Sequence, residues 1–450
     1  MKLKKQDFYG ELKYNGEMYP FYYDNFIVKI IQTPGKYNDK FNDATEIEKI
    51  SGITNSGKTI VFLKCELRGG RFKECYSNLV FSTKGYVLFE GQEYEFDCIR
   101  FNAKALGTFY PSMTSVNQKE LFDNFNYNLE HQKECFDVEI DNEIITMELK
   151  NEYQFSLRSE EERIGNKKST WTMKFAESKK AEDIAMYYLY LYDFLSFVNF
   201  RRYIEMDNFV LFNSQNEFYN IAEGKFNNYK IPYDGKPQNS VIYSNIKKDI
   251  GRIFSYIGIQ RKTHYEENRF MPLDLDEFTK FDQYDWLKTA IRFEGEYLKK
   301  YAGNKYSTDN NFVIAKDFLL QAIDQKIEQS GVSMNNPKNK YWKKFKRLIS
   351  YEDTTLEEKF NFALDHFKNE IESIKDFQVK EKECLDKVDR LGAEYSEFRN
   401  KLAHGSFEQI SPENCVNFTL MRSFIYCFIL ERAGASSETI KVVIEKLFLK

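Results

Sequence analysis

The sequence predicts an α+β protein with an N-terminal antiparallel β-rich region, a mixed middle region and a C-terminal all-α helical bundle. Up to about residue 160, short apolar or alternating runs are separated by Gly, Asn and Asp, which is the pattern of antiparallel strands and hairpins. From about residue 280, apolar residues recur every three or four positions, as they do in packed helices. A chain of 450 residues is also too long for one ordinary core.

Residues 1–165 form the predicted β-rich domain. Its strand-like runs are FYGELKY, NFIVKII, KTIVFLKCEL, NLVFSTKGYVLFEG, EYEFDCIRF, CFDVEID and EIITMELK. Asn15–Gly16 and Lys84–Gly85 are predicted to be hairpin turns between such runs. A β-sandwich or an open barrel is the expected arrangement.

Residues 166–278 form the predicted mixed region. The segment AEDIAMYYLYLYDFLSFVNF is apolar on nearly every side, which indicates a buried helix. Strand-like FVLFN follows, then VIYSNIKKDIGRIF, and the stretch around Met271–Pro272 is a plausible boundary.

Residues 279–450 are predicted to form a helical bundle. The five periodic segments are WLKTAIRFEGEYLKKYA, NFVIAKDFLLQAIDQKIEQSG, TLEEKFNFALDHFKNEIESI, VKEKECLDKVDRLGAEYSEFRNKLAHG and PENCVNFTLMRSFIYCFILERAG. Thr355 with Glu358 resembles a capping box, and Ser411–Pro412 is typical of a helix start. Expected helix ends lie at Gly331, Gly405 and Gly434.

Composition limits the classes of function. A net charge of −4 excludes a generally basic surface, so any nucleic-acid site must be a local patch. The seven cysteines include no CxxC pair and are expected to be reduced thiols of a cytoplasmic protein. No run of about 18 apolar residues occurs, so neither export nor a membrane span is expected. The aromatic content of 17% is attributed to base composition of the gene, and individual rings receive little functional weight.

The segment RNKLAH, residues 399–404, carries the candidate chemistry. The helix before it has a buried stripe at Leu385, Val388, Leu391, Tyr395, Phe398 and Leu402. Arg399 and Asn400 lie about 100° and about 200° from Phe398, outside that stripe. Asn400 and His404 are four residues apart and share a face, so Asn400 is expected to orient the imidazole. His404 lies in the last turn, where the helix dipole favours a protonated ring.

This cluster suits the cleavage of RNA by its own 2′-hydroxyl. A histidine can take the 2′-hydroxyl proton or give a proton to the leaving 5′-oxygen. An arginine can hold the scissile phosphate and stabilise its added charge. The reaction requires no metal. Because one histidine can hardly act as base and acid at once, two copies across a dimer interface make chemical sense.

An arginine, a polar residue, three further residues and a histidine at a helix end resemble the signature of HEPN ribonucleases, here Arg399, Asn400 and His404. The motif closes the penultimate helix of the predicted bundle, where that family keeps it. The segments FYGELKYNGEMYPFYYDNF, SGKTIVFLKCEL and GQEYEFDCIRFNAKALGTFY are similar to the N-terminal domain of ApeA-type anti-phage proteins. This likeness covers most of the chain, although only RNKLAHG is specific at residue level.

The resemblance implies a homodimer or a higher homo-oligomer with a composite active site that needs no metal or cofactor and leaves a 2′,3′-cyclic phosphate. It also implies an abortive-infection toxin that cleaves host RNA, with tRNA as the expected target and a phage-derived trigger as a further partner. In the alternative, the bundle is a non-catalytic dimerisation scaffold, and the β-rich domain binds a phage or host partner.

A basic, aromatic segment is the second candidate for contact with RNA. KNKYWKKFKR, residues 338–347, has six basic residues interleaved with Tyr341, Trp342 and Phe345. The cations suit a phosphate backbone, and the rings suit base stacking. The alternative is a solvated helix face with its aromatic residues in the core. The residues expected to bind RNA are Lys340, Lys343, Lys344, Lys346, Arg347 and Lys401.

Other motifs are interpreted as structural. GITNSGKT, Gly52–Thr59, matches the P-loop pattern, but strand-like sequence follows it where a P-loop opens a helix, so a hairpin turn is expected. His131, His264 and His366 have no partner at metal-ligand spacing, and His366 is expected to be structural. Glu394 and Glu397 are expected on a solvated face, although either is within reach of a neighbouring protomer as a resting partner of Arg399.

Overall fold

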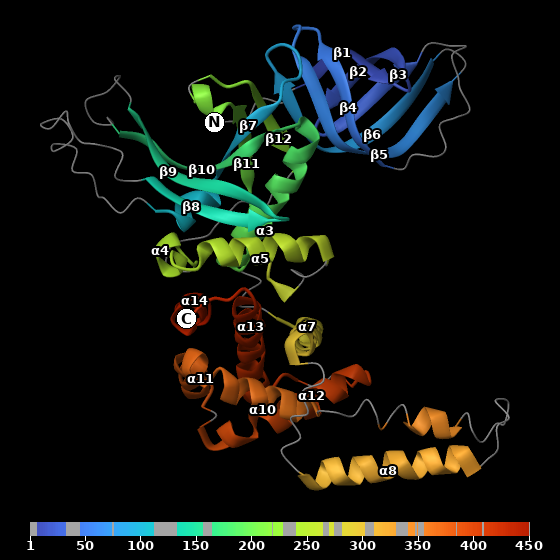
Figure 1. Cartoon of the computed structure of the whole chain (residues 1–450), viewed down its shortest axis with the longest axis vertical. Coiled ribbons are helices and arrows are strands. Elements are labelled where there is room, and N and C mark those ends of the chain that lie inside the picture. The colour runs from blue at the N-terminus through green and yellow to red at the C-terminus, as the bar shows by residue number, and fades with distance from the viewer. Residues whose placement is uncertain are drawn as a thin grey trace, which may run out of the picture. The chain divides into compact units, whose positions relative to one another are not determined.

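The structure, a computed structural model, folds into two compact units, Met1–Phe278 and Thr279–Lys450. Within the described residues, strands and a few helices build the first unit and helices build the second (Figure 1). The predicted α+β class is therefore confirmed. The residues described are 7–32, 46–73, 76–111, 133–155, 164–217, 219–227, 240–263, 270–273, 281–301, 310–329, 341–346, 349, 355–383, 385–406 and 409–449.

In the described part of the first unit, twelve strands form one sheet, and each pairing is antiparallel. The strands are β1 (Phe8–Tyr14), β2 (Glu17–Asp24), β3 (Ile27–Gln32), β4 (Glu46–Thr54), β5 (Thr59–Lys73), β6 (Tyr76–Phe89), β7 (Phe96–Ala103), β8 (Lys133–Ile140), β9 (Glu143–Phe155), β10 (Ile164–Lys179), β11 (Met206–Phe212) and β12 (Ala222–Phe226). β11 and β12 lie between β6 and β7, so the predicted mixed region shares this sheet with the N-terminal region.

The first six strands close into a barrel-like ring. Their order is β3-β2-β1-β4-β5-β6, and β3 pairs with β6 to complete the ring. The long strand β6 pairs with β3 near its start and with β12 near its end. It therefore joins the ring to the open half of the sheet. An open barrel was one of the two arrangements expected, and the β3–β6 pairing closes it.

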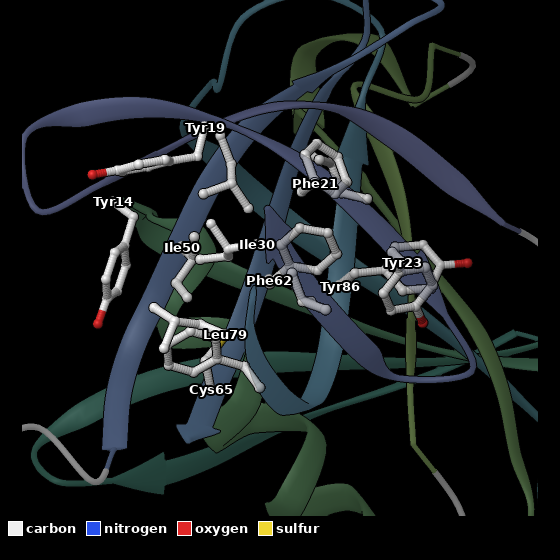
Figure 2. Close-up of a cluster of buried hydrophobic side chains, with 14 of the residues drawn as sticks. Tyr14, Tyr19, Phe21, Tyr23, Ile30, Ile50, Phe62, Cys65, Leu79 and Tyr86 are labelled. Carbon is white, nitrogen blue, oxygen red and sulfur yellow. The ribbon is translucent and has the colours of Figure 1, made fainter. Parts of the chain in front are cut away.

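Alternating apolar side chains fill the interior of this ring. In β1 and β2 every second side chain is the more buried one, as expected for strands with one face on a core. Phe62 meets Tyr23 and Phe21 at 5.3 Å and 5.5 Å between ring centroids (Figure 2). Part of the high aromatic content thus serves packing.

One of the two predicted hairpin turns is confirmed and the other is wrong. Asn15 and Gly16, with φ of 49° and 87°, make the tight turn between β1 and β2. At Lys84–Gly85, in contrast, β6 continues without a turn, and the residues before and after this pair are both partnered with β5. A Cβ atom at Gly85 would lie 2.7 Å from Phe226 Cδ1 and 2.9 Å from Lys225 O. Gly85 therefore permits the close approach of β12.

Helices pack on the open half of the sheet. The described helices of the first unit are α1 (Lys104–Phe109), η3 (Ala181–Asp183), α3 (Ile184–Asn199), η4 (Ser214–Asn216), α4 (Tyr243–Ile246) and α5 (Ile250–Thr263). Of these, α1 and α5 contact strands of that half. α3 is buried on nearly all sides, as predicted, and it packs on α1 and α5. Trp171 of β10 is fully buried among the rings of Phe109, Phe194 and Phe254, which ties the helices to the sheet.

The second unit contains α7 (Gln283–Tyr301), α8 (Asn310–Gln329), α10 (Leu356–His366), α11 (Lys368–Glu381), η7 (Leu385–Arg390), α12 (Leu391–Ala403), α13 (Pro412–Arg432) and α14 (Ser437–Phe448). The helices predicted over α7, α8 and α13 are confirmed, whereas α14 was not predicted. Because α13 and α14 both follow it, the motif helix α12 is not the penultimate helix, as was expected. Two predicted helices are interrupted: α10 and α11 meet at Phe367, and η7 separates α11 from α12. The motif helix therefore begins at Leu391.

The predicted start signals of two helices are present as hydrogen bonds. Glu358 N donates to Thr355 Oγ1 at 3.1 Å, and Thr355 N donates to Glu358 Oε2 at 2.6 Å. Asn414 N donates to Ser411 Oγ at 3.2 Å at the start of α13. The helix ends at Gly405 and Gly434 have positive φ values of 80° and 74°, whereas Gly331 lies outside the described residues.

α13 is the central helix of the bundle. It is buried along its length and packs against α7, α11, α12 and α14. Trp286 of α7 is fully buried, and its Nε1 donates to Asn414 O at 2.9 Å. The Trp286 ring also contacts Tyr395 and Phe398, so one side chain links α7, α12 and α13. No described helix is long and apolar enough to cross a membrane.

Candidate active site

The end of α12 presents the RNKLAH segment. Tyr395, Phe398 and Leu402 of α12 are buried, as the predicted stripe requires, whereas Val388 lies in η7 and is only half-buried. Gly405 has a φ of 80°, and its N donates to Leu402 O at 3.1 Å. A glycine in this left-handed region ends a helix without steric cost. His404 is consequently the C-terminal cap residue of α12, and its side chain is exposed.

Arg399 is held by a carboxylate from another helix. Its Nε donates to Glu294 Oε1 at 2.9 Å, and its Nη2 donates to Glu294 Oε2 at 3.2 Å. Tyr395 Oη donates to the same Oε1 at 3.1 Å. Burial raises the pKa of Tyr395 well above its ordinary value, and the charge of Glu294 raises this pKa further. Tyr395 therefore stays protonated and remains a donor.

The sequence missed Glu294 as the partner of Arg399. Glu394 and Glu397 were expected on a solvated face. Glu397 is exposed, and Glu394 is half-buried with its Oε1 3.7 Å from Arg390 Nη2. Glu294 precedes Arg399 by 105 residues, on α7. No local spacing reveals this pair, because it depends on how α7 packs against α12.

His404 and Asn400 are both exposed. Across the part of the chain that the structure describes, neither side chain makes a hydrogen bond, so the expected Asn400–imidazole bond is not formed there. Lys401 is also exposed and lies between them in sequence. Arg399, Asn400, Lys401 and His404 thus occupy one helix end, with Arg399 anchored inward.

The basic segment is only partly described. Lys340 and Arg347 lie outside the described residues, whereas residues 341–346 form a short helix in which Lys343 and Lys344 are exposed. Lys346 Nζ lies 2.6 Å and 2.7 Å from the two carboxylate oxygens of Asp324 on α8. This ion pair connects the short helix to α8, a different element from α12.

Gly52–Thr59 is a hairpin turn, as predicted. It connects β4 to β5, and β5 begins at Thr59 where a P-loop would begin a helix. Gly57 has a φ of 81°, and its N donates to Thr54 O at 2.9 Å. Lys58 Nζ lies 2.6 Å from Glu90 Oε1. The lysine is therefore engaged with a carboxylate beside the turn.

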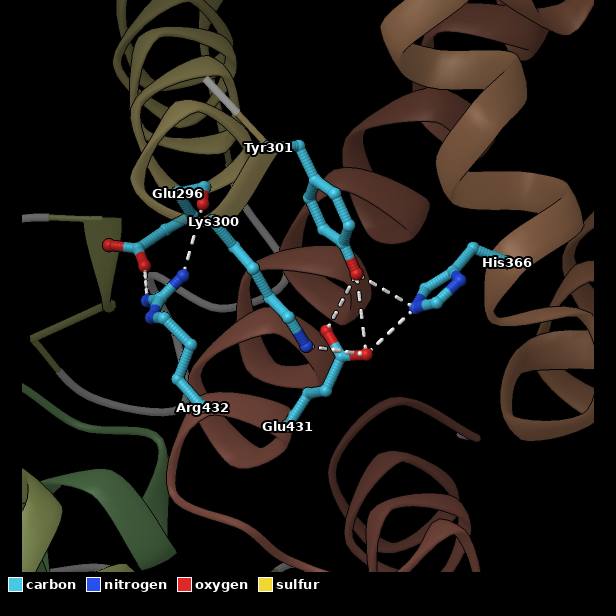
Figure 3. A network of polar contacts seen from close by, with 6 residues as sticks. All are labelled: Glu296, Lys300, Tyr301, His366, Glu431 and Arg432. Carbon is cyan, nitrogen blue, oxygen red and sulfur yellow. Dashed lines mark hydrogen bonds and ion pairs between the residues drawn. The ribbon is translucent and has the colours of Figure 1, made fainter. Parts of the chain in front are cut away.

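His366 belongs to a polar network that connects three helices (Figure 3). Its Nε2 lies 2.8 Å from Glu431 Oε1, and Lys300 Nζ lies 2.9 Å from the same oxygen. Tyr301 Oη lies 3.1 Å from Glu431 Oε2 and 3.0 Å from His366 Nε2. Because α7, α10 and α13 each contribute, the network supports the structural interpretation of His366.

The network predicts how stability depends on pH. Burial alone would raise the pKa of Glu431, but hydrogen bonds from His366 and Lys300 lower it below its ordinary value of 4.5. A carboxyl with a depressed pKa stabilises the fold above its unfolded-state pKa, and this stabilisation is lost as the pH falls through the folded-state pKa. We therefore expect Glu431→Gln to lower the melting temperature at pH 7, and the difference from wild type to shrink below pH 4.5.

Thermal melts of both proteins between pH 3 and pH 7 measure this difference. Lys441→Gln, at an exposed position of the neighbouring helix α14, is the control. A wild-type-to-variant difference that stays constant across the range would contradict the prediction.

The described residues include five free cysteines and no group of three or more His, Cys, Asp or Glu residues arranged to hold a metal ion. Comparison with protein-family models, with curated proteins and with solved structures finds no match for this chain.

Proposed function

We propose that the helical unit is an endoribonuclease that cleaves RNA through attack of a 2′-hydroxyl on the adjacent phosphodiester. The observation that carries this proposal is the placement of Arg399 and His404 at one exposed helix end. The buried side chains of α12 pack this helix against α7, α10 and α13. His404 extends from it with no partner among the described residues, and Arg399 is partly accessible, with 25% of its side chain exposed.

The reaction needs one proton taken and one proton given. The 2′-oxygen bonds to phosphorus, the bond from phosphorus to the 5′-oxygen breaks, and a 2′,3′-cyclic phosphate and a 5′-hydroxyl result. A neutral imidazole of His404 accepts the 2′-hydroxyl proton, and a protonated imidazole donates to the 5′-oxygen. Arg399 donates hydrogen bonds to the phosphate oxygens, whose charge grows in the transition state.

Two copies of the chain supply both protonation states of His404 at one phosphodiester. We therefore propose a homodimer as the active species. The biological setting, abortive infection with host tRNA cleaved after a phage-derived trigger, is proposed from the resemblance to ApeA-type proteins. Lys401, Lys343 and Lys344, which are exposed, are proposed to bind the RNA backbone.

The alternative function is a dimerisation scaffold. The ion pair between Arg399 and Glu294 favours it, because a bidentate arginine–carboxylate pair also serves to hold two helices together. In that case the RNKLAH residues bind no RNA, and the first unit recognises the partner.

Product chemistry tests the proposal. Full-length protein in molar excess is incubated with total RNA and with tRNA, with and without EDTA, and the RNA ends are sequenced. We expect 2′,3′-cyclic phosphate ends in both conditions and no cut where the nucleotide before the scissile bond lacks its 2′-hydroxyl. Arg399→Ala should remove these ends, whereas Arg390→Ala, at the opposite end of α12, should retain them. If wild type and Arg399→Ala give identical RNA ends, the ribonuclease proposal is wrong and the dimerisation scaffold is the remaining function.

A further inference from the structure

We propose that Glu294 is a positioning residue for this cleavage. By binding one edge of the Arg399 guanidinium, Glu294 directs the other edge toward the phosphodiester. The inference rests on the proposed ribonuclease function. It concerns a residue that the RNKLAH motif does not contain and that lies on a different helix, α7.

The origin of the positioning is a buried aromatic cluster. Tyr395 is fully buried and stacks on Phe360 at 4.9 Å between ring centroids, with Trp286 and Phe293 each at 5.7 Å. Close packing on three sides restricts the ring to one orientation. The Tyr395 hydroxyl, which stays protonated, therefore donates to Glu294 from a constant place.

Glu294 in turn holds one edge of the guanidinium. A guanidinium can bind an anion through its Nε/Nη2 edge or through its Nη1/Nη2 edge. Glu294 occupies Nε and Nη2, and within the described residues Nη1 of Arg399 has no hydrogen-bond partner. The side chain of Glu294 is 15% exposed and that of Arg399 is 25% exposed. Nη1 and the second hydrogen of Nη2 are therefore the donors that remain for a phosphate while Nε and the first hydrogen of Nη2 stay bonded to Glu294.

This arrangement orients the arginine without adding to the attraction for RNA. The negative charge of Glu294 offsets the positive charge of Arg399, so the pair attracts distant RNA only weakly. The hydrogen-bond donors on the second edge nevertheless keep their direction. Removing Glu294 should therefore leave RNA binding unchanged or tighter and should slow the chemical step, because a misdirected guanidinium stabilises the transition state less well. A carboxylate that instead blocked Arg399 would have the opposite effect, since its removal would speed cleavage.

The test compares kcat and KM for variants of the full-length chain on one RNA substrate. We expect Glu294→Ala to lower kcat by about 10- to 100-fold without raising KM. Glu294→Gln keeps an acceptor oxygen for Arg399 Nε and Tyr395 Oη, so we expect it to recover most of kcat. Tyr395→Phe, which removes only the hydroxyl, should lower kcat in the same direction. Asp285→Ala is the matched control, because Asp285 is an acidic residue of α7 that pairs with Lys288 and not with Arg399.

A variant could also lose activity because part of the protein is misfolded. Titration with an RNA that lacks the 2′-hydroxyl at the cut site measures the fraction of protein that binds RNA, and kcat is corrected for this fraction. The Glu294→Ala loss must persist after this correction. An unchanged or raised kcat in Glu294→Ala, or equal losses in Glu294→Ala and Glu294→Gln, overturns the positioning role. If Arg399→Ala itself leaves cleavage intact, the proposed ribonuclease function fails, which is a different outcome.

Discussion

Replacing His404 with alanine is expected to lower the rate of RNA cleavage by about 10²- to 10⁴-fold, the range that one general acid or base contributes. The imidazole is exposed at the end of α12 and makes no hydrogen bond among the described residues. Its removal should therefore leave the fold intact. Single-turnover cleavage of a defined RNA measures the effect.

Glu397→Ala is the control for this variant, because Glu397 is exposed on the same helix and has no proposed role. The melting temperature and the oligomeric state in solution should match those of the wild type for both variants. If His404→Ala cleaves RNA at the wild-type rate, the imidazole of His404 is not the general acid or base, and the proposed cleavage mechanism is wrong.

A mixing experiment tests whether two copies share one site. If both His404 residues act on one phosphodiester, an equal mixture of wild type and His404→Ala that has exchanged subunits should retain about a quarter of the activity, the share of wild-type dimers. Copies that act alone would retain half.

The second large effect is expected on stability, from Trp286→Ala. Trp286 is fully buried, and it links α7 to α12 and α13 through ring contacts and its bond to Asn414 O. Truncation of a buried tryptophan to alanine costs about 3–5 kcal/mol, and it also leaves the Asn414 carbonyl without its donor. We expect faster hydrogen–deuterium exchange in α7, α12 and α13.

Tyr284→Ala is the matched control for Trp286→Ala. Tyr284 lies two residues away on α7 and is 68% exposed, so its truncation should change stability by less than about 0.5 kcal/mol. Equal exchange rates in the two variants would contradict the role of Trp286 as the link between the three helices.

The faces and ends of elements were predictable from the sequence because they depend on local periodicity. Tyr395, Phe398 and Leu402 are buried as their spacing requires, and Gly405 ends α12 with a positive φ. These two features bring Arg399 and His404 to the end of one helix. Gly52–Thr59 was correctly assigned to a hairpin, because the residues after it are typical of a strand.

Where a glycine or a helix break depends on distant contacts, local patterns were misleading. Lys84–Gly85 has the composition of a turn, but Gly85 lies inside β6 because Phe226 of β12 passes too close for a Cβ atom. The periodic stretch before Leu391 predicted one continuous helix, whereas η7 interrupts it. The closure of the ring by β3 and β6 likewise joins residues about 50 positions apart.

By itself the sequence determined the α+β class, the hairpin at Asn15–Gly16 and the helix end that carries Arg399 and His404, since each follows from neighbours within a few residues. Only the tertiary structure decided which carboxylate meets Arg399. Glu294 reaches it across 105 residues because Trp286, Phe293 and Tyr395 pack α7 against α12. Such partners are determined by side-chain packing between helices, so they cannot be predicted from the spacing of residues along one helix.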